Sequence, residues 1–146
     1  MKENIRLGFE LKKTMSAFSK RIDHSYFMYT HPELSQRSMF ILNYLFYHQN
    51  EVVYQKDIEK EFSVHKSTIS DLISNMEKHG YLLRRSPESD ARYRNIELTD
   101  SGKEIVEGFK KELDKIELEL QKQFTNEELM NFMNNLIKIR NCLKEE

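Results

Sequence analysis

The chain has 146 residues, 38% of them apolar, and a formal net charge of −1 at pH 7. This length suits one domain or one compact subunit. The near-neutral charge excludes a globally basic surface for nucleic acid or membrane, so any signal for either must be local. The single cysteine, Cys142, excludes an internal disulfide.

The N-terminal residues MKENIRLGFELKK contain no apolar stretch of the kind found in a signal peptide. The longest apolar run, from Met39 to Leu42, is far shorter than the ~18 residues that a membrane-spanning helix needs. We therefore expect a soluble, cytoplasmic protein.

Helical periodicity dominates the first third of the chain. Apolar residues between Leu11 and Tyr29 recur at spacings of three and four, which predicts one helix over residues 5–29. His31 precedes a proline, and such a residue avoids the α region, so this helix should already have ended. Ser35 is a candidate N-cap for a second helix, up to His48, whose apolar character nearly all round predicts a central position.

The middle of the chain predicts two short helices, residues 54–62 and 66–78, joined by three residues. A very short strand could precede them at Val52 and Val53. Gly80 follows the second helix where the backbone must enter the left-handed region. The second helix has an apolar face at spacings i, i+3, i+4 and i+7, made by Ile69, Leu72, Ile73 and Met76.

Two strands, residues 81–86 and 92–98, are predicted around a PESDA turn. Thr99 is a candidate N-cap for a long helix that runs to Phe124. Thr125 and Glu128 have the spacing of a capping box that opens the last helix. The predicted fold is therefore mainly α with a small β wing, and both ends of the chain are amphipathic helices.

The face of helix 66–78 opposite its apolar residues is polar. Its short side chains can reach phosphates and base edges in a DNA major groove. Asn75 could pair with adenine if it reaches that deep, whereas the alternative is an ordinary solvated helix face. The candidate DNA-binding residues here are Lys66, Ser67, Thr68, Ser70, Asp71, Ser74 and Asn75.

Four arginines gather at the predicted hairpin. Alternation along the second strand directs Arg92 and Arg94 to the face of Ile96 and Leu98, beyond the end of the core. An arginine on a protruding ribbon can enter a narrow minor groove, and Asp90 could hold its guanidinium in position. The alternative is a solvated hairpin tip with surface ion pairs worth ~0–1 kcal/mol. The candidate DNA-binding residues here are Arg84, Asp90, Arg92 and Arg94.

Three stretches together resemble a known family. Residues 58–70, IEKEFSVHKSTIS, are similar to a helix–turn–helix of the LAxxLGVSxxTVS kind. Residues 75–82, NMEKHGYL, resemble the LExxGL that ends a recognition helix, and 90–102 contain a DxR and an LTxxG motif. In this order they resemble the MarR family of bacterial transcriptional regulators. The resemblance covers the whole chain in element order and residues 52–102 in motif.

The resemblance implies a homodimer with one winged helix–turn–helix lobe per subunit on a pseudo-palindromic double-stranded DNA site. It implies that helix 66–78 reads the major groove while Arg92 enters the adjacent minor groove. We expect a single subunit over residues 1–146, with the lobe at 33–100 and dimerisation helices at 1–30 and 101–146. The expected function is a sequence-specific, DNA-binding repressor without a cofactor.

Several residues depart from the family pattern. Glu59 stands where a small residue is usual, and Ser63 replaces the usual turn glycine. Asp71 replaces a common arginine, and it could accept from cytosine N4 or repel a phosphate. Residues 54–100 contain eight Lys and Arg against nine Asp and Glu. DNA binding would therefore depend on the arrangement of charges rather than on net charge.

Regulators of this family commonly respond to a small molecule. An effector pocket for an aromatic acid could form here, although the same rings could simply belong to an aromatic core. The residues of this predicted pocket are Tyr26, Tyr29, Phe40, Tyr44 and Tyr47.

Other functional classes have weaker signals. The five histidines form no close ligand pair, so no metal site is expected. Cys142 lies at the opposite end of the chain from the cysteine with which some family members sense oxidants. No nucleophile–base set is apparent, so we do not expect an enzyme. The alternatives that stay open are a winged-helix protein–protein interaction module and a metal- or oxidant-sensing regulator.

Overall fold

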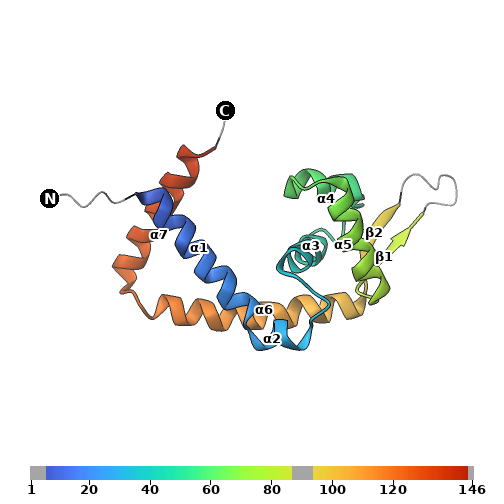
Figure 1. Ribbon diagram of the computed structural model, residues 1–146, viewed down its shortest axis with the longest axis horizontal. Helices are drawn as coiled ribbons and strands as arrows, with labels where there is room; N and C mark the ends of the chain where they lie inside the picture. The colour runs from blue at the N-terminus through green and yellow to red at the C-terminus, as the bar shows by residue number, and fades with distance from the viewer. Residues whose placement is uncertain (1–5, 87–93, 145–146) are drawn as a thin grey trace. The chain divides into compact units, whose positions relative to one another are not determined.

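The structure is a computed structural model, and it describes residues 6–86 and 94–144. The chain divides into two compact units, Met1–Glu112 and Leu113–Glu146. The predicted class, mainly α with a small β wing, is confirmed. The elements are α1 Leu7–Asp23, α2 Tyr26–Thr30, α3 Gln36–Tyr47, α4 Gln55–Phe62, α5 Lys66–Lys78, β1 Leu82–Arg85, β2 Asn95–Leu98, α6 Asp100–Gln121 and α7 Asn126–Cys142 (Figure 1).

The prediction of one helix over residues 5–29 is wrong, because the backbone breaks after Asp23. Ser25 adopts an extended conformation there, and its hydroxyl accepts a hydrogen bond from the Met28 amide at 3.3 Å. A serine oxygen that caps an exposed amide favours a new helix start over continuation. The predicted apolar stripe does not continue in the structure, because Tyr26 and Tyr29 are 74% and 80% exposed while Phe27 and Met28 are buried.

The other helix starts were predicted correctly. The Ser35 hydroxyl accepts from the backbone of α3, and the Thr99 hydroxyl accepts from the first turn of α6 at 3.0 Å. At the start of α7, the Thr125 amide donates to the Glu128 carboxylate at 2.8 Å, and the Glu128 amide donates to the Thr125 hydroxyl at 3.3 Å. Each of these side chains satisfies an amide that a helix start leaves without a partner.

Helix α3 forms the centre of the lobe, as its apolar sequence predicts. It contacts α5 and β2, while α5 also contacts α4 and β1 (Figure 1). Met39 and Leu42 of α3 are fully buried. Burying one such side chain stabilises the fold by roughly 1.5–3 kcal/mol. The side chains that the other elements place in this core are Ile58, Ile69, Ile73, Met76 and Leu82, all at most 1% exposed.

The wing is an antiparallel pair in which Leu82 faces Leu98 and Arg85 faces Asn95. The short strand expected at Val52 and Val53 is reduced to a single bridge between Tyr54 and Asn95. The Ile96 amide also donates to the Val53 carbonyl at 2.8 Å, so the segment before α4 holds the outer side of β2.

Two glycines of α6 allow close packing within the first unit. A Cβ on Gly108 would lie 2.9 Å from the Phe27 ring, which also packs on Phe109 with centroids 5.5 Å apart. A Cβ on Gly102 would lie 2.0 Å from the Tyr81 carbonyl oxygen. Helix α6 therefore approaches α2 and the start of the wing more closely than a larger residue at either of these two positions would permit.

The second unit contains the last part of α6 and the whole of α7. Helix α7 has no buried residue over its described length, Asn126–Cys142. Among the described residues, no helix combines the length and the apolar character that crossing a membrane requires. The exposed large apolar side chains of the second unit are Leu118, Leu120, Phe124, Met130, Phe132, Met133, Ile137 and Leu143.

We predict that Gly102→Ala destabilises the protein by about 1–3 kcal/mol, because the added methyl group meets backbone that cannot move aside. The matched control is Gly8→Ala in α1, where a Cβ meets no atom within 4 Å. That change should be neutral, or stabilising by up to ~1 kcal/mol through helix propensity. Urea unfolding of both variants measures the difference, and equal midpoints would contradict the close contact.

Candidate nucleic-acid interface

Helices α4 and α5 form a helix–turn–helix with a three-residue connection. Ser63 makes the turn with φ 48° and ψ 42°, the left-handed conformation for which glycine is usually chosen. Ile58 on α4 and Ile69 on α5 are both at most 1% exposed and fix the two helices on the core. The two helices are therefore held in one geometry by burial on both sides of the turn.

The buried residues of α5 determine which side chains face outward. Ile69, Ile73 and Met76 point into the core, so the opposite face is presented to solvent. Lys66, Ser67, Asp71 and Ser74 are exposed there, while Thr68, Ser70 and Asn75 are half-buried. The predicted polar face is thus present.

Asn75 has a partner inside the lobe. Its side-chain amide donates to the Glu33 carbonyl at 2.9 Å, and the Glu33 carboxylate accepts from the Tyr81 hydroxyl. These bonds connect the last turn of α5, the start of the wing and the segment between α2 and α3. This bond engages one N–H of the Asn75 amide inside the lobe, and the expected adenine contact of Asn75 stays a prediction.

Burial by itself raises the pKa of Glu33. The hydrogen bond from Tyr81, with smaller contributions that include nearby His31 and His79, more than offsets this and leaves that pKa below its ordinary value. Burial, and then the same hydrogen bond, raise the pKa of Tyr81 to about 12. At neutral pH the carboxylate is therefore the acceptor and the phenol the donor, which is the combination that a strong charge-assisted bond requires.

Arg84 is also held within the lobe, and its side chain is only 15% exposed. Its Nη1 lies 2.9 Å from Glu77 Oε2, and its backbone amide donates to the same carboxylate at 3.2 Å. Its Nη2 donates to the Ser74 hydroxyl at 3.2 Å and reaches the Ser70 carbonyl at 3.4 Å. The residue expected to contact DNA thus joins β1 to α5 and keeps the wing in place beside that helix.

The remaining arginines of the hairpin differ from one another. Arg85 pairs with Glu97 of the neighbouring strand at 2.9 Å. Arg94 is exposed and immediately precedes β2. Asp90 and Arg92, for which the motif implies a minor-groove contact, lie outside the described residues.

A groove of about 580 Å³ runs between α4, α5 and the wing. Its lining carries four cationic side chains and one acid, Glu59, which accepts a hydrogen bond from Gln55 at 2.9 Å. Positive charge concentrated in a cleft attracts a polyanion even when the whole domain is neutral. The lining residues are Tyr54, Gln55, Lys56, Glu59, Lys66, Ser70, Ser74, Arg84, Arg94 and Ile96.

Sequence reasoning missed Tyr54, Gln55 and Lys56 as candidates, because the polar face that predicts base contacts belongs to the second helix of the pair. Lys56 lies 5.6 Å from the centroid of the Tyr54 ring, at the start of α4. The sequence signal that could have identified Lys56 is its place at the start of a predicted helix. A helix start presents free amides and favours anions.

Most residues of the predicted aromatic pocket are exposed to solvent in the first unit. Tyr26, Tyr29 and Tyr47 are 74%, 80% and 66% exposed. Tyr44 is half-buried and stacks on His48 with centroids 4.0 Å apart. Phe40 is also exposed. These rings leave a large aromatic surface in contact with solvent, and the effector pocket stays a prediction.

The alternative of a metal- or oxidant-sensing regulator concerns the histidines, the acids and Cys142. In the stretches 6–86 and 94–144, no three His, Cys, Asp or Glu side chains come close enough together to hold a metal ion. Cys142 is exposed at the end of α7.

The fold and the site together define a winged helix–turn–helix protein, with a polar helix face beside a cationic groove. A model of the family described as transcriptional regulator SarA/Rot matches residues 25–109, more than half of the chain. The chain belongs to this family of transcriptional regulators. The expected assignment to a winged-helix regulator, and not to an enzyme, is confirmed.

Three similar proteins illustrate the relationship. An uncharacterized HTH-type transcriptional regulator of Bacillus subtilis, YdgJ, is 29% identical over 74% of this chain, which spans 65% of that protein. The HTH-type transcriptional regulator BilQ of Clostridioides difficile is 29% identical over 70% of this chain and 72% of its own length. The Staphylococcus aureus MepR–DNA complex has a TM-score of 0.80 at 26% identity, covering 97% of this chain and all of that one.

We predict that Arg84→Ala lowers the free energy of unfolding by about 1–3 kcal/mol, because it leaves the carboxylate of Glu77 without its charged partner. The matched control, Arg94→Ala, removes an exposed guanidinium and should leave the unfolding free energy unchanged. A double-mutant cycle with Glu77→Gln should show a coupling of at least ~0.5 kcal/mol. Additive effects of the two changes would show that the contact is not stabilising.

Proposed function

We propose that this chain is a sequence-specific, double-stranded DNA-binding transcriptional regulator that acts as a homodimeric repressor on a pseudo-palindromic operator. The observation that carries the proposal is the exposed polar face of α5 beside a groove lined by Lys56, Lys66 and Arg94, by the internally paired Arg84 and by one acid. This arrangement explains how a near-neutral lobe can bind a polyanion. The likeness to the MepR–DNA complex over nearly the whole chain supports it.

In the proposed complex, α5 lies in the major groove with Ser67, Asp71 and Ser74 toward the bases. Lys66 and Arg94 line the groove beside that face and contact phosphates of the DNA backbone. Arg84 keeps the wing beside α5, so that both elements meet the duplex together. The motif residue Arg92 enters the adjacent minor groove and is held there by Asp90.

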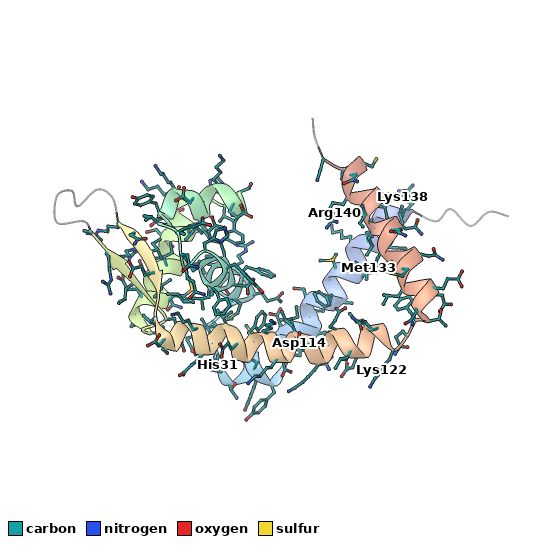
Figure 2. All side chains as sticks on the ribbon, turned by 180° about the vertical axis from the view of Figure 1, so that it is seen from behind. His31, Asp114, Lys122, Met133, Lys138 and Arg140 are labelled. Atoms are coloured by element: carbon teal, nitrogen blue, oxygen red, sulfur yellow. The ribbon has the colours of Figure 1, made fainter. Side chains whose placement is uncertain are left out.

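The proposed homodimer rests on apolar surface that one copy leaves exposed. On α1, Leu7, Phe9 and Met15 are 57%, 59% and 63% exposed. On α7, which carries Met133 and Arg140 (Figure 2), apolar side chains line a shallow pocket of about 500 Å³ without burying any residue of the helix. Exposed apolar surface on this scale is typical of an interface, and a two-fold dimer presents two lobes to two half-sites.

A small aromatic effector would act as the releasing signal in this proposal. What supports it is the exposed ring surface of Tyr26, Tyr29 and Tyr47, since such rings can stack on an aromatic ligand. A cytoplasmic location follows from the proposed role, because the operator lies there.

DNA binding can be tested by gel retardation with the duplex upstream of the chain's own gene. Affinity should fall steeply with salt as counterions are released. Lys66→Ala should reduce the slope of log K against log salt by about one, because one phosphate contact is lost. Lys110→Ala, which removes an exposed lysine of α6, should leave the slope unchanged. Absence of any retardation, or retention of a protein partner in place of DNA, would favour a protein-interaction module.

We predict that Ile137→Glu dissociates the homodimer, because it places a charge in the apolar surface of α7. Asn135→Glu adds the same charge to an exposed polar position of the same helix and should leave the dimer intact. Sedimentation velocity measures the mass of both variants. A wild-type chain that sediments as a monomer at micromolar concentration would refute the dimer.

A further inference from the structure

Asp71 is an acid on the helix face that the proposed function directs at DNA. It follows Ser67 by one helical turn and lies on the side of α5 opposite Ile69 and Ile73, so its carboxylate points outward. The side chain is exposed. An acid in this place is unexpected, because the backbone of DNA is itself negative.

No residue in the described stretches 6–86 and 94–144 neutralises this charge. On α5 the residues three and four positions from Asp71 are Ser67, Thr68, Ser74 and Asn75, and none is cationic. Among the described residues, Asp71 has no hydrogen bond or ion pair. Arg84, the cation close to this part of α5, is turned toward Glu77 and Ser74. As far as the described part of the chain goes, Asp71 therefore keeps its hydrogen-bonding capacity for an incoming partner.

The cations that suit phosphates lie to one side of Asp71. Lys66, Arg94 and Lys56 line the groove toward the wing, and Asp71 is not among the residues of that lining. The two functions are thus separated along the surface, with backbone contacts at the groove and an acid where α5 points outward. In the proposed complex, this separation directs Asp71 at base edges and leaves the phosphates to the cations of the groove.

An ionised carboxylate can only accept hydrogen bonds. In the major groove, guanine presents the acceptors N7 and O6, and thymine presents O4 and a methyl group, so both would face the charge without a donor. Adenine has a donor at N6 but an acceptor at the neighbouring N7. Cytosine presents the N4 amino group alone, and it is the base whose edge matches an acceptor-only side chain.

We propose that Asp71 determines the specificity of one position in each half-site, where it accepts from the N4 amino group of a cytosine and excludes guanine and thymine. The inference rests on the proposed function and deepens it by naming a base and the residue that reads it. Cytosine at this position should be preferred over guanine or thymine by roughly 5- to 150-fold, the range of one good base contact.

The test selects duplexes from a randomised library with the full-length chain and compares base frequencies at every position. The wild-type pool should show cytosine at one position per half-site. Asp71→Asn carries a donor and an acceptor, a pair that matches adenine N6 and N7, so its pool should change to adenine at that same position. Asp71→Ala should lose the preference there and keep it elsewhere.

The matched control is Asp114→Asn, which removes the same charge from an exposed position on α6 (Figure 2) and should leave all preferences unchanged. Thermal unfolding checks that the variants fold like the wild type. If the wild type selects a sequence and the Asp71 variants select the same one, the inference fails while the proposed function stands. If the wild type selects no sequence, both fail.

Discussion

The burial of one face of α5 is the constraint on which the whole site depends. One side of α5 is buried in the core through Ile69, Ile73 and Met76, so the opposite side of the same helix must face outward. That side carries short polar residues, which leave room for another molecule to approach closely. Two internal ties then fix the helix further: Asn75 bonds to Glu33, and the Arg84–Glu77 pair joins α5 to the first strand of the wing. The core sets the direction of the helix, and the polar bonds set its position.

The charges of the lobe are likewise divided between internal contacts and outward-facing positions. Residues 54–100 contain nearly equal numbers of acids and bases, yet the groove beside α5 has four cations and a single acid. One of the four, Arg84, is paired with Glu77, which leaves Lys56, Lys66 and Arg94 for a partner. Acids such as Glu77 and Glu97 are occupied in ion pairs with arginines of β1. The lobe therefore separates structural charge, which is paired inside or along the wing, from charge that is available to a partner. In a transcriptional regulator, charge that stays available in this way can serve to bind a partner.

Much of the fold could be predicted from local patterns, because caps and apolar spacing act over a few residues. Ser35, Thr99 and Thr125 were found in this way. The break at Ser25 was missed, since the apolar spacing of the sequence continues across it and the capping oxygen is a single atom. The roles of Asn75 and Arg84 could not be found from spacing at all. The partner of Asn75 lies 42 residues away in the sequence, and the partners of Arg84 lie on a different element from its own strand.

Tyr81 makes hydrogen bonds through both its backbone and its side chain. Its amide donates to Met76 at the end of α5, its carbonyl accepts from Thr99 at the start of α6 and lies against Gly102, and its hydroxyl reaches Glu33. Close-packed junctions of this kind deform little. The Thr99 hydroxyl also donates to the Gly80 carbonyl at 2.6 Å, so the start of α6 is tied to the end of α5 at two successive residues. Tyr81 thus joins three parts of the lobe, and displacing any one of them would strain its contacts with the other two.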